Sequence, residues 1–409
     1  MKKKVWIAIA ALCVTTLTGM SASVRGPAAD SAPKFVAQDQ DPIVSAGYYQ
    51  PLKSIHSDYA VFRCKVQLEL CEVHSVLRGG YTEQFLGMGP LNSEPSLSLD
   101  YSLATSSNVP YQYVFWAGPG PHYDLMEAYF NGRWHGPINL GMGGVQSQPA
   151  APRVWYSTAV SGNPNGEAVA WTNARDQVLY ATSSDPASKR SWKGPFTTKL
   201  GNVGYSLTAV DTGGSFESVW WEENGDLYAG NIPRIDRNGQ TWGPCNFGMG
   251  VVGTTPSVVW VPWTLPDIPG VHHDSQPSAE SFNYHAPHWK GNCPAHLYPL
   301  SQDWYGAAGQ YVACWGGATA KGQLYCMPWA LVADTDGEVA GPLKIGNMGV
   351  LGSAPSITVW PYSVKFFTPI TMLAFWMSST AKEDLIAAQI NPPSKPKDLG
   401  FGPIGPLGE

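Results

Sequence analysis

The stretch Leu86-Gly87-Met88-Gly89, followed by Pro95 and the apolar run 96–101, decides the fold because it recurs along the chain. Copies of its first part, an apolar residue with two nearby glycines, begin 47 to 60 residues apart, except for one interval of 98 residues. In four copies a proline stands six residues after the last glycine and opens an apolar run, and proline is tolerated at the first residue of a strand. The six copies span 86–89, 140–143, 200–204, 247–250, 345–349 and 399–402.

Each copy continues in the same order. A second apolar run contains a tryptophan near its end, and a third run follows after a short Gly-rich or charged turn such as Asn224-Gly225, a hairpin signal. In three copies Trp134, Trp192 or Trp242 then opens a fourth run with Trp-x-Gly-Pro or Trp-Gly-Pro. Six units of four short strands predict an all-β fold, a six-bladed β-propeller of four-stranded antiparallel blades. We expect the repeated glycines to have positive φ or a close backbone neighbour.

The composition agrees with this fold and excludes several others. The 409 residues include 44 Gly, 35 Pro and 17 Trp, and 44% are hydrophobic while only 14% are charged. This apolar fraction excludes a mainly disordered chain. Gly and Pro interrupt almost every window of helical length, which excludes long helical bundles.

The N-terminus predicts export. Three lysines, Lys2 to Lys4, precede the apolar run 5–14, and the small residues 21–23 follow, which is the pattern of a signal peptide. We therefore expect a signal peptide at 1–23, a flexible segment at 24–40 and the propeller at 41–409, in an extracellular or periplasmic protein. No later run is long enough to insert into a membrane. Removing three lysines changes the net charge from −6 to 22 − 31 = −9, which argues against nucleic acid as a partner.

Six cysteines remain after cleavage, and an even number in an exported chain predicts disulfides. Cys64 and Cys71 flank a short strand-like run, and Cys314 and Cys326 flank an expected hairpin, so each pair can form a bridge. The third expected bridge joins the remaining two, Cys245 and Cys293. The alternative, a zinc site, lacks any Cys-x-x-Cys spacing.

The interval of 98 residues contains a Pro-rich loop insert at about 264–305 that holds five of the nine histidines. A metal site is one alternative for this insert, and a degenerate seventh blade is another. No helical spacing supports the metal site, so we expect no metal and no cofactor. The ligands of that alternative site would be His272, His273, Asp274, His285 and His288.

The order of motifs resembles the repeats of secreted bacterial propeller lectins, namely the fucose-binding lectin group and its relatives from insect pathogens. The Leu-Tyr-Ala strands at 179–181 and 227–229 are also similar to the horseshoe-crab type of propeller lectin. The resemblance covers about residues 40–409 and implies glycan binding in grooves between blades. In those lectins the sugar pockets repeat an Arg–Glu–aromatic set. Here no Arg recurs at an equivalent position, so neither fucose specificity nor the number of sites carries over.

A non-catalytic carbohydrate-binding protein is therefore the function that we predict, with glycans or glycoconjugates as partners. Aromatic faces stack on pyranose rings, and neighbouring polar side chains bind the hydroxyls. In the fourth unit we expect Trp220 to be packed inside and the ring of Trp221 to be partly exposed, because adjacent strand residues face opposite ways. The candidate sugar contacts are Trp155, Tyr156, Trp221, Glu222, Asn224 and Trp263.

Two other classes remain open. A propeller glycoside hydrolase needs two carboxylates about 5–9.5 Å apart. The candidates for such a pair are Asp100, Asp211, Glu222 and Glu223. A protein-binding propeller without chemistry is the third class, and the oligomeric state cannot be assigned from the sequence.

Overall fold

The computed structural model describes strands and turns within a compact unit of residues 35–409. The residues that it describes are 44–49, 57–64, 69–76, 80–104, 110–153, 167–203, 207–211, 216–233, 241–247, 252–262, 300–302, 308–318, 323–326, 343–346, 348–359, 372–380, 382–391 and 393–401. The expected signal peptide, the segment 24–40 and most of the insert lie outside these residues.

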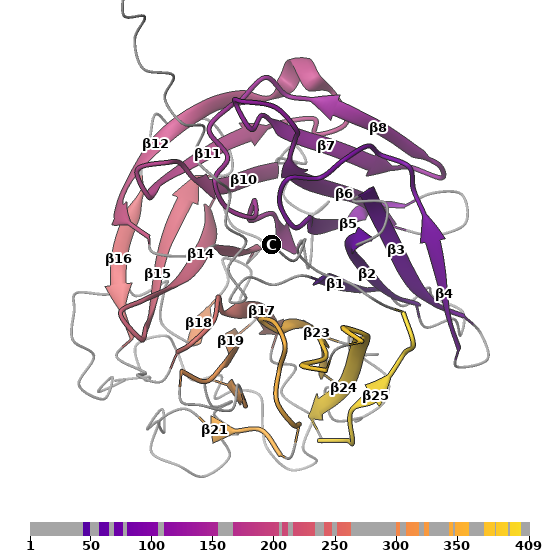
Figure 1. Ribbon diagram of the computed structural model, residues 1–409. Coiled ribbons are helices and arrows are strands. Elements are labelled where there is room, and N and C mark those ends of the chain that lie inside the picture. Colours follow the sequence, from indigo (N-terminus) through magenta and orange to yellow (C-terminus); the bar gives the residue numbers. More distant parts are fainter. Residues whose placement is uncertain are drawn as a thin grey trace, which may run out of the picture. The chain divides into compact units, whose positions relative to one another are not determined.

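The described residues form six sheets, which we number in chain order (Figure 1). Sheet 1 contains β1 (Val44–Tyr49), β2 (Ser57–Cys64), β3 (Glu69–Val76) and β4 (Gly80–Phe85). Sheet 2 contains β5 (Ser96–Ala104), β6 (Pro110–Ala117), β7 (Leu125–Phe130) and β8 (Trp134–Asn139). Sheet 3 contains β10 (Glu167–Thr172), β11 (Gln177–Ser183) and β12 (Lys193–Asn202), with the 3-10 helix η1 (Lys189–Ser191) before β12.

The other three sheets follow the same plan. Sheet 4 contains β9 (Pro152–Arg153), β13 (Thr208–Asp211), β14 (Phe216–Glu223), β15 (Asp226–Pro233) and β16 (Trp242–Asn246). Sheet 5 contains β17 (Ser257–Pro262), β18 (Leu300–Gln302), β19 (Ala308–Gly316), β20 (Leu324–Cys326) and β21 (Leu343–Lys344). Sheet 6 contains β22 (Ser356–Val359), β23 (Met372–Met377), β24 (Leu385–Asn391) and β25 (Lys397–Asp398).

The expected order of four antiparallel strands is therefore confirmed in sheets 1, 2 and 6. Sheets 4 and 5 contain it with one additional strand each, and the described part of sheet 3 has three strands. The run after Pro149 was expected to be the first strand of the third unit. Instead, β9 pairs in parallel with β13 of sheet 4, and only Ala150 forms a bridge to Ala170 of sheet 3. The insert is also not loop throughout, because β18 pairs with β19.

Apolar clusters join each sheet to its neighbours in the chain. Successive clusters lie between sheets 1 and 2, 2 and 3, 3 and 4, 4 and 5, and 5 and 6. A further cluster packs Phe62 and Val73 of sheet 1 against Phe375 and Leu385 of sheet 6. The inner strands also contact one another in a ring, which runs β1, β5, β9, β13, β17, β22 and back to β1. Both faces of each sheet are thus covered by neighbouring sheets, which is why the strands carry so many aromatic residues.

A serine or threonine stands two residues before the proline that opens the first strand, and its hydroxyl connects that segment to the second strand. The hydroxyl of Ser93 accepts a hydrogen bond from the backbone N–H of Ala117 at 2.8 Å. Ser353 does the same for Met377 at 3.0 Å. The repeated hydroxyl therefore satisfies a backbone donor at the end of β6 or β23 that would otherwise be buried without a partner.

The Gly of the Trp-x-Gly-Pro motif has a steric explanation. Gly136, Gly194 and Gly243 have φ values of 129°, 136° and 107°. A Cβ on Gly194 would lie 3.1 Å from the Cα of Ala181 on the neighbouring strand. The strand pairing slips by one residue at this point in all three sheets. These bulges bend the fourth strand and re-aim the tryptophan that precedes them.

Two of the expected disulfides are confirmed. Cys64 is bonded to Cys71, and Cys314 is bonded to Cys326 across two adjacent strands. Cys245 also belongs to a disulfide, but its expected partner Cys293 lies outside the described residues. No helix in the described part of the chain is long and apolar enough to span a membrane.

Candidate functional site

The hairpin between β14 and β15 carries the densest group of residues that the sequence suggested. Asn224 is exposed at its tip, where φ is 56°, and Glu223 is half-buried. Glu222 is only 4% exposed, and its Oε1 accepts a hydrogen bond from the backbone N–H of Gly225. Burial raises the pKa of Glu222, the hydrogen bond from Gly225 lowers it, and the nearby negative charges raise it again.

The expectation that Trp221 has an exposed ring is wrong. Trp220 and Trp221 are both 0% exposed, because each ring enters the apolar cluster on its own side of sheet 4. Trp221 stacks on Tyr228 with 5.9 Å between ring centroids and 18° between planes. Tyr228 therefore presents the half-buried aromatic ring at this edge, and Trp221 supports it from inside.

A polar network surrounds Tyr228. The side-chain amide of Asn246 donates to the Tyr228 hydroxyl at 2.8 Å and to Asp226 Oδ2 at 3.1 Å. Burial and the charges of Glu223 and Asp226 raise the pKa of Tyr228, while the bond from Asn246 lowers it. Asp226 at the start of β15 thus accepts a hydrogen bond from Asn246 of β16. In sheet 2, the side-chain amide of Asn139 donates in the same way to Asp124 Oδ2 at 2.8 Å.

The remaining expected sugar contacts lie outside the described residues, as do all ligands of the alternative metal site. They are Trp155, Tyr156 and Trp263, and His272, His273, Asp274, His285 and His288. The side chains of Asp100 and Asp211 are not described.

The backbone of sheet 4 separates three of the proposed catalytic carboxylates, Asp211, Glu222 and Glu223. Glu222 and Glu223 are adjacent on β14, so their side chains face opposite sides of sheet 4. Asp211 pairs with Glu217, which is five residues, or about 17 Å, from Glu222 along the strand. That backbone separation exceeds the 5–9.5 Å that a pair of glycosidase carboxylates requires.

A contact between sheets 1 and 2 was not anticipated from the sequence. Glu72 on β3 is 4% exposed, and its Oε2 accepts a hydrogen bond at 3.4 Å from the indole N–H of Trp134 at the start of β8. Burial raises the pKa of Glu72 to about 7, and the hydrogen bond from Trp134 reduces this shift. Trp134 itself is half-buried, so a buried acid and a partly accessible ring meet between sheets 1 and 2.

Between sheets 2 and 3 an acid and a tryptophan again lie side by side, but here the indole N–H of Trp192 donates to the carbonyl of Pro186. Glu127 on β7 is 0% exposed, and Trp192, which directly precedes β12, lies beside it with 7% exposure. Burial raises the pKa of Glu127 to about 8, the indole of Trp192 lowers it, and Asp185 raises it. Phe115 meets Trp192 edge-on at 5.5 Å between ring centroids, and Trp192 is more buried than Trp134.

Strand register shows that the two acids are equivalent. Glu72 pairs with Val61 and Glu127 pairs with Phe115, at matching positions of the second and third strands. Tyr180 occupies this position in sheet 3, and Cys326 occupies it in sheet 5, where it forms the disulfide. The common Leu-x-Glu of Leu70 to Glu72 and Leu125 to Glu127 could have revealed the pair, but the irregular first unit obscured the alignment.

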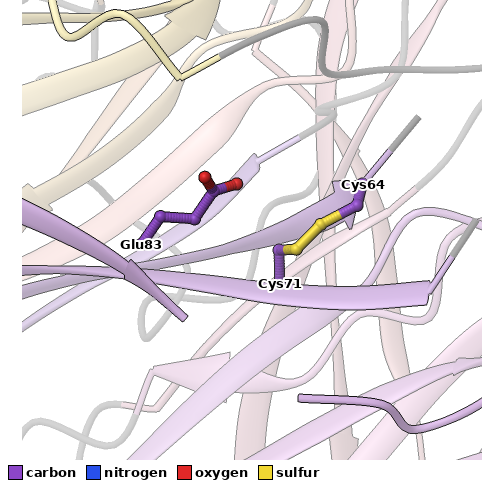
Figure 2. Close-up of side chains that lie close together, drawn as sticks. All are labelled: Cys64, Cys71 and Glu83. Carbon is purple, nitrogen blue, oxygen red and sulfur yellow. A yellow bond between two sulfur atoms is a disulfide. The ribbon is translucent and has the colours of Figure 1, made fainter. Parts of the chain in front are cut away.

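A third group of close side chains is not a metal site in this state. The carboxylate of Glu83 lies beside Cys64 and Cys71 (Figure 2). The two sulfur atoms are bonded to each other, and a disulfide does not supply the thiolates that zinc binds.

Comparison with known proteins agrees with the architecture. No protein-family model and no curated protein matches the sequence. Among solved structures, the fucose-specific lectin from Aleuria aurantia matches with a TM-score of 0.57 at 11% identity, over 88% of this chain and 97% of that one. Another structure of this lectin, described as a fungal lectin with a six-bladed β-propeller fold, gives 0.55 at 12% identity, over 90% and 96%.

The fold is that of a β-propeller. AofleA from Arthrobotrys oligospora shares it, with a TM-score of 0.55 at 9% identity over 90% of each chain. These identities are too low to transfer a ligand or a site residue. In a propeller, the two Glu–Trp contacts lie between adjacent blades.

Proposed function

We propose that this protein is a non-catalytic, glycan-binding propeller with six blades, exported by the signal peptide at 1–23. The observation that carries the proposal is the contact between Glu72 and Trp134, in which two adjacent sheets each supply one half of a sugar-compatible pair. The half-buried indole of Trp134 offers a face for the apolar side of a pyranose. The carboxyl group of Glu72 offers oxygen atoms to sugar hydroxyls.

The contact between sheets 1 and 2 is the primary site in this proposal because Trp134 is half-buried there, whereas Trp192 between sheets 2 and 3 is buried. Gln84 stands opposite Glu72 in the β3–β4 register and is exposed, so a further polar side chain borders this contact. Between sheets 2 and 3, Trp192 is covered by Phe115 and held by its N–H bond to the carbonyl of Pro186 at 3.2 Å. Tyr228 and its polar network, next to the expected contacts Glu222 and Asn224, form a secondary candidate.

The name of the Aleuria lectin states fucose specificity, so fucosylated glycans belong among the first probes. A glycan array with the mature protein tests binding, and isothermal titration with the best ligand tests the site. We expect Trp134→Ala and Glu72→Gln to reduce affinity at least ten-fold. Glu83→Gln, an exposed carboxylate on the adjacent β4, is the matched control and should bind like the parent protein.

A variant that loses its fold would also lose binding, so each variant is first compared with the parent by its melting temperature. Trp134→Phe keeps a ring but removes the N–H donor, and it should retain part of the affinity if stacking contributes. The proposal fails if no array glycan binds at millimolar concentration. It also fails at this site if folded Trp134→Ala binds as tightly as the parent.

A further inference from the structure

The segment just before β12 carries a group of exposed cations. Lys189 and Arg190 lie in η1, and Lys193 begins β12, all three exposed to solvent. Within the described part of the chain, Lys189 and Arg190 form no ion pair with any acid. This concentration of positive charge is unexpected in a chain whose net charge is −6. We call Lys189, Arg190 and Lys193 the basic rim.

The basic rim is held by a well-ordered loop. The backbone N–H of Ser188 donates to the carbonyl of Asp185 at 2.9 Å, and that of Ser191 donates to Ser188 at 3.0 Å. The hydroxyl of Ser191 also bonds to Ser183 and to the carbonyl of Asp185. The backbone that carries the cations is thus already organised, so a ligand would have to order only their side chains.

The rim adjoins the packed contact between sheets 2 and 3. Trp192 lies between Arg190 and Lys193 in the sequence, and its indole packs beside Glu127 in the apolar cluster between these sheets. Because the pKa of Glu127 is about 8, its carboxyl group carries little negative charge at neutral pH. Asp185 is then the exposed acid of the same loop, against three cations.

We propose that the basic rim binds the acidic groups of an anionic polysaccharide, either carboxylates or sulfates. Three cations within five residues match one or two charged sugars, and each would form a charge-assisted hydrogen bond at the surface. A nucleic acid duplex fits less well. It would extend beyond this short rim over the surface of a protein whose net charge is negative, as its own is. The inference rests on the proposed glycan binding only in choosing a polysaccharide as the ligand.

The test compares two triple variants that remove equal charge. Lys189→Ser/Arg190→Ser/Lys193→Ser removes the rim, and Lys382→Ser/Lys395→Ser/Lys397→Ser removes three exposed cations of sheet 6. The probes are heparin for sulfate, polygalacturonate for carboxylate, neutral dextran and a DNA duplex, measured by biolayer interferometry in 50 mM and 500 mM NaCl. All proteins are first compared with the parent by melting temperature.

The parent should bind heparin, polygalacturonate or both at the lower salt concentration and lose them at the higher one, because exposed charges are screened. Each exposed ion pair should contribute about two-fold to the affinity, so removing the three cations of the rim should weaken binding roughly ten-fold. The sheet 6 variant should change it less than two-fold. Equal losses in both variants, or no binding of either anionic probe, would overturn the proposal. The choice of a polysaccharide as the ligand would be overturned if DNA bound as tightly as the anionic polysaccharides and its binding depended on the rim.

These outcomes are distinct from those of the proposed site. Trp134→Ala should reduce the affinity for the neutral array glycan at least ten-fold and leave heparin or polygalacturonate binding intact. Loss of the rim should do the reverse. A protein that binds neutral glycans but ignores the anionic probes retains the proposed function and loses this inference.

Discussion

The indole N–H of Trp134 crosses from sheet 2 to the carboxyl group of Glu72 in sheet 1, with 3.4 Å between Nε1 and Oε2. The bulge at Gly136 follows directly after this tryptophan and bends β8. The Trp-x-Gly-Pro motif therefore also directs the ring of its tryptophan toward the neighbouring blade. Trp192 lies beside Glu127 one blade further on, but its indole N–H donates to the carbonyl of Pro186.

Stability should fall with rising pH because of Glu127. Its pKa rises from 4.5 to about 8 on folding, so between these values the folded protein holds a proton that the unfolded chain has released. The stabilising effect of the neutral carboxyl is complete below pH 4.5 and is lost as pH rises to 8. Glu127→Gln cannot ionise, so its stability relative to that of the parent should rise by about 4 kcal/mol between pH 5 and pH 9.

Urea unfolding at pH 5, 7 and 9 measures this difference. Glu83→Gln serves as the control, because Glu83 is exposed on β4. A Glu127→Gln variant whose stability follows the parent in parallel at all three pH values would show that Glu127 ionises normally.

Gly194 should tolerate substitution less well than Gly201. Both have positive φ, 136° and 89°, so alanine is strained at either position. Only at Gly194 would the new Cβ meet the backbone of β11, at 3.0 Å from the carbonyl oxygen of Tyr180, whereas nothing lies within 4 Å at Gly201. We expect a loss of about 1 kcal/mol for Gly201→Ala and at least about 3 kcal/mol for Gly194→Ala in thermal unfolding. Equal losses would contradict the steric explanation.

Sequence repetition could predict the strands, but it could not predict which face of each strand meets which neighbour. The positions of Trp134, Trp192 and Trp242 marked the fourth strands correctly, and the spacing of Cys314 and Cys326 predicted their bridge. Trp221 was misplaced because a strand in a propeller is buried on both faces, so alternation does not expose either ring. Glu72 was missed because its tryptophan comes from a different repeat.

The buried ion pair between Arg63 and Glu94 should matter for the contact between sheets 1 and 2. The Arg63 guanidinium lies 2.7 Å from Glu94 Oε1 and also donates to the carbonyl of Leu91 at 3.3 Å. Glu94→Ala leaves a buried charge without its partner and should cost about 3 to 5 kcal/mol. The double variant Arg63→Met/Glu94→Leu removes both charges and should recover most of this loss. A single variant with the stability of the parent would show that water reaches Arg63.

Non-reducing peptide mapping should show three bridges in the exported protein, Cys64–Cys71, Cys314–Cys326 and Cys245–Cys293. The double variant Cys314→Ala/Cys326→Ala opens a loop of 12 residues and should lose about 3 kcal/mol at most by the chain-entropy estimate. The stability of the reduced parent provides the comparison. Recovery of Cys245 as a free thiol would contradict the third bridge.

Truncation of either Trp220 or Trp221 should destabilise the protein by about 3 to 5 kcal/mol, because both rings are fully buried. Trp220 stacks on Phe247 at 4.9 Å between centroids, and Trp221 stacks on Tyr228. Each alanine variant therefore leaves a cavity on one side of sheet 4. Glu223→Gln, two residues after Trp221 and half-buried, should melt like the parent. If Trp221→Ala kept the melting temperature of the parent and lost glycan binding instead, the ring would be a sugar contact after all, and its burial in sheet 4 would be wrong.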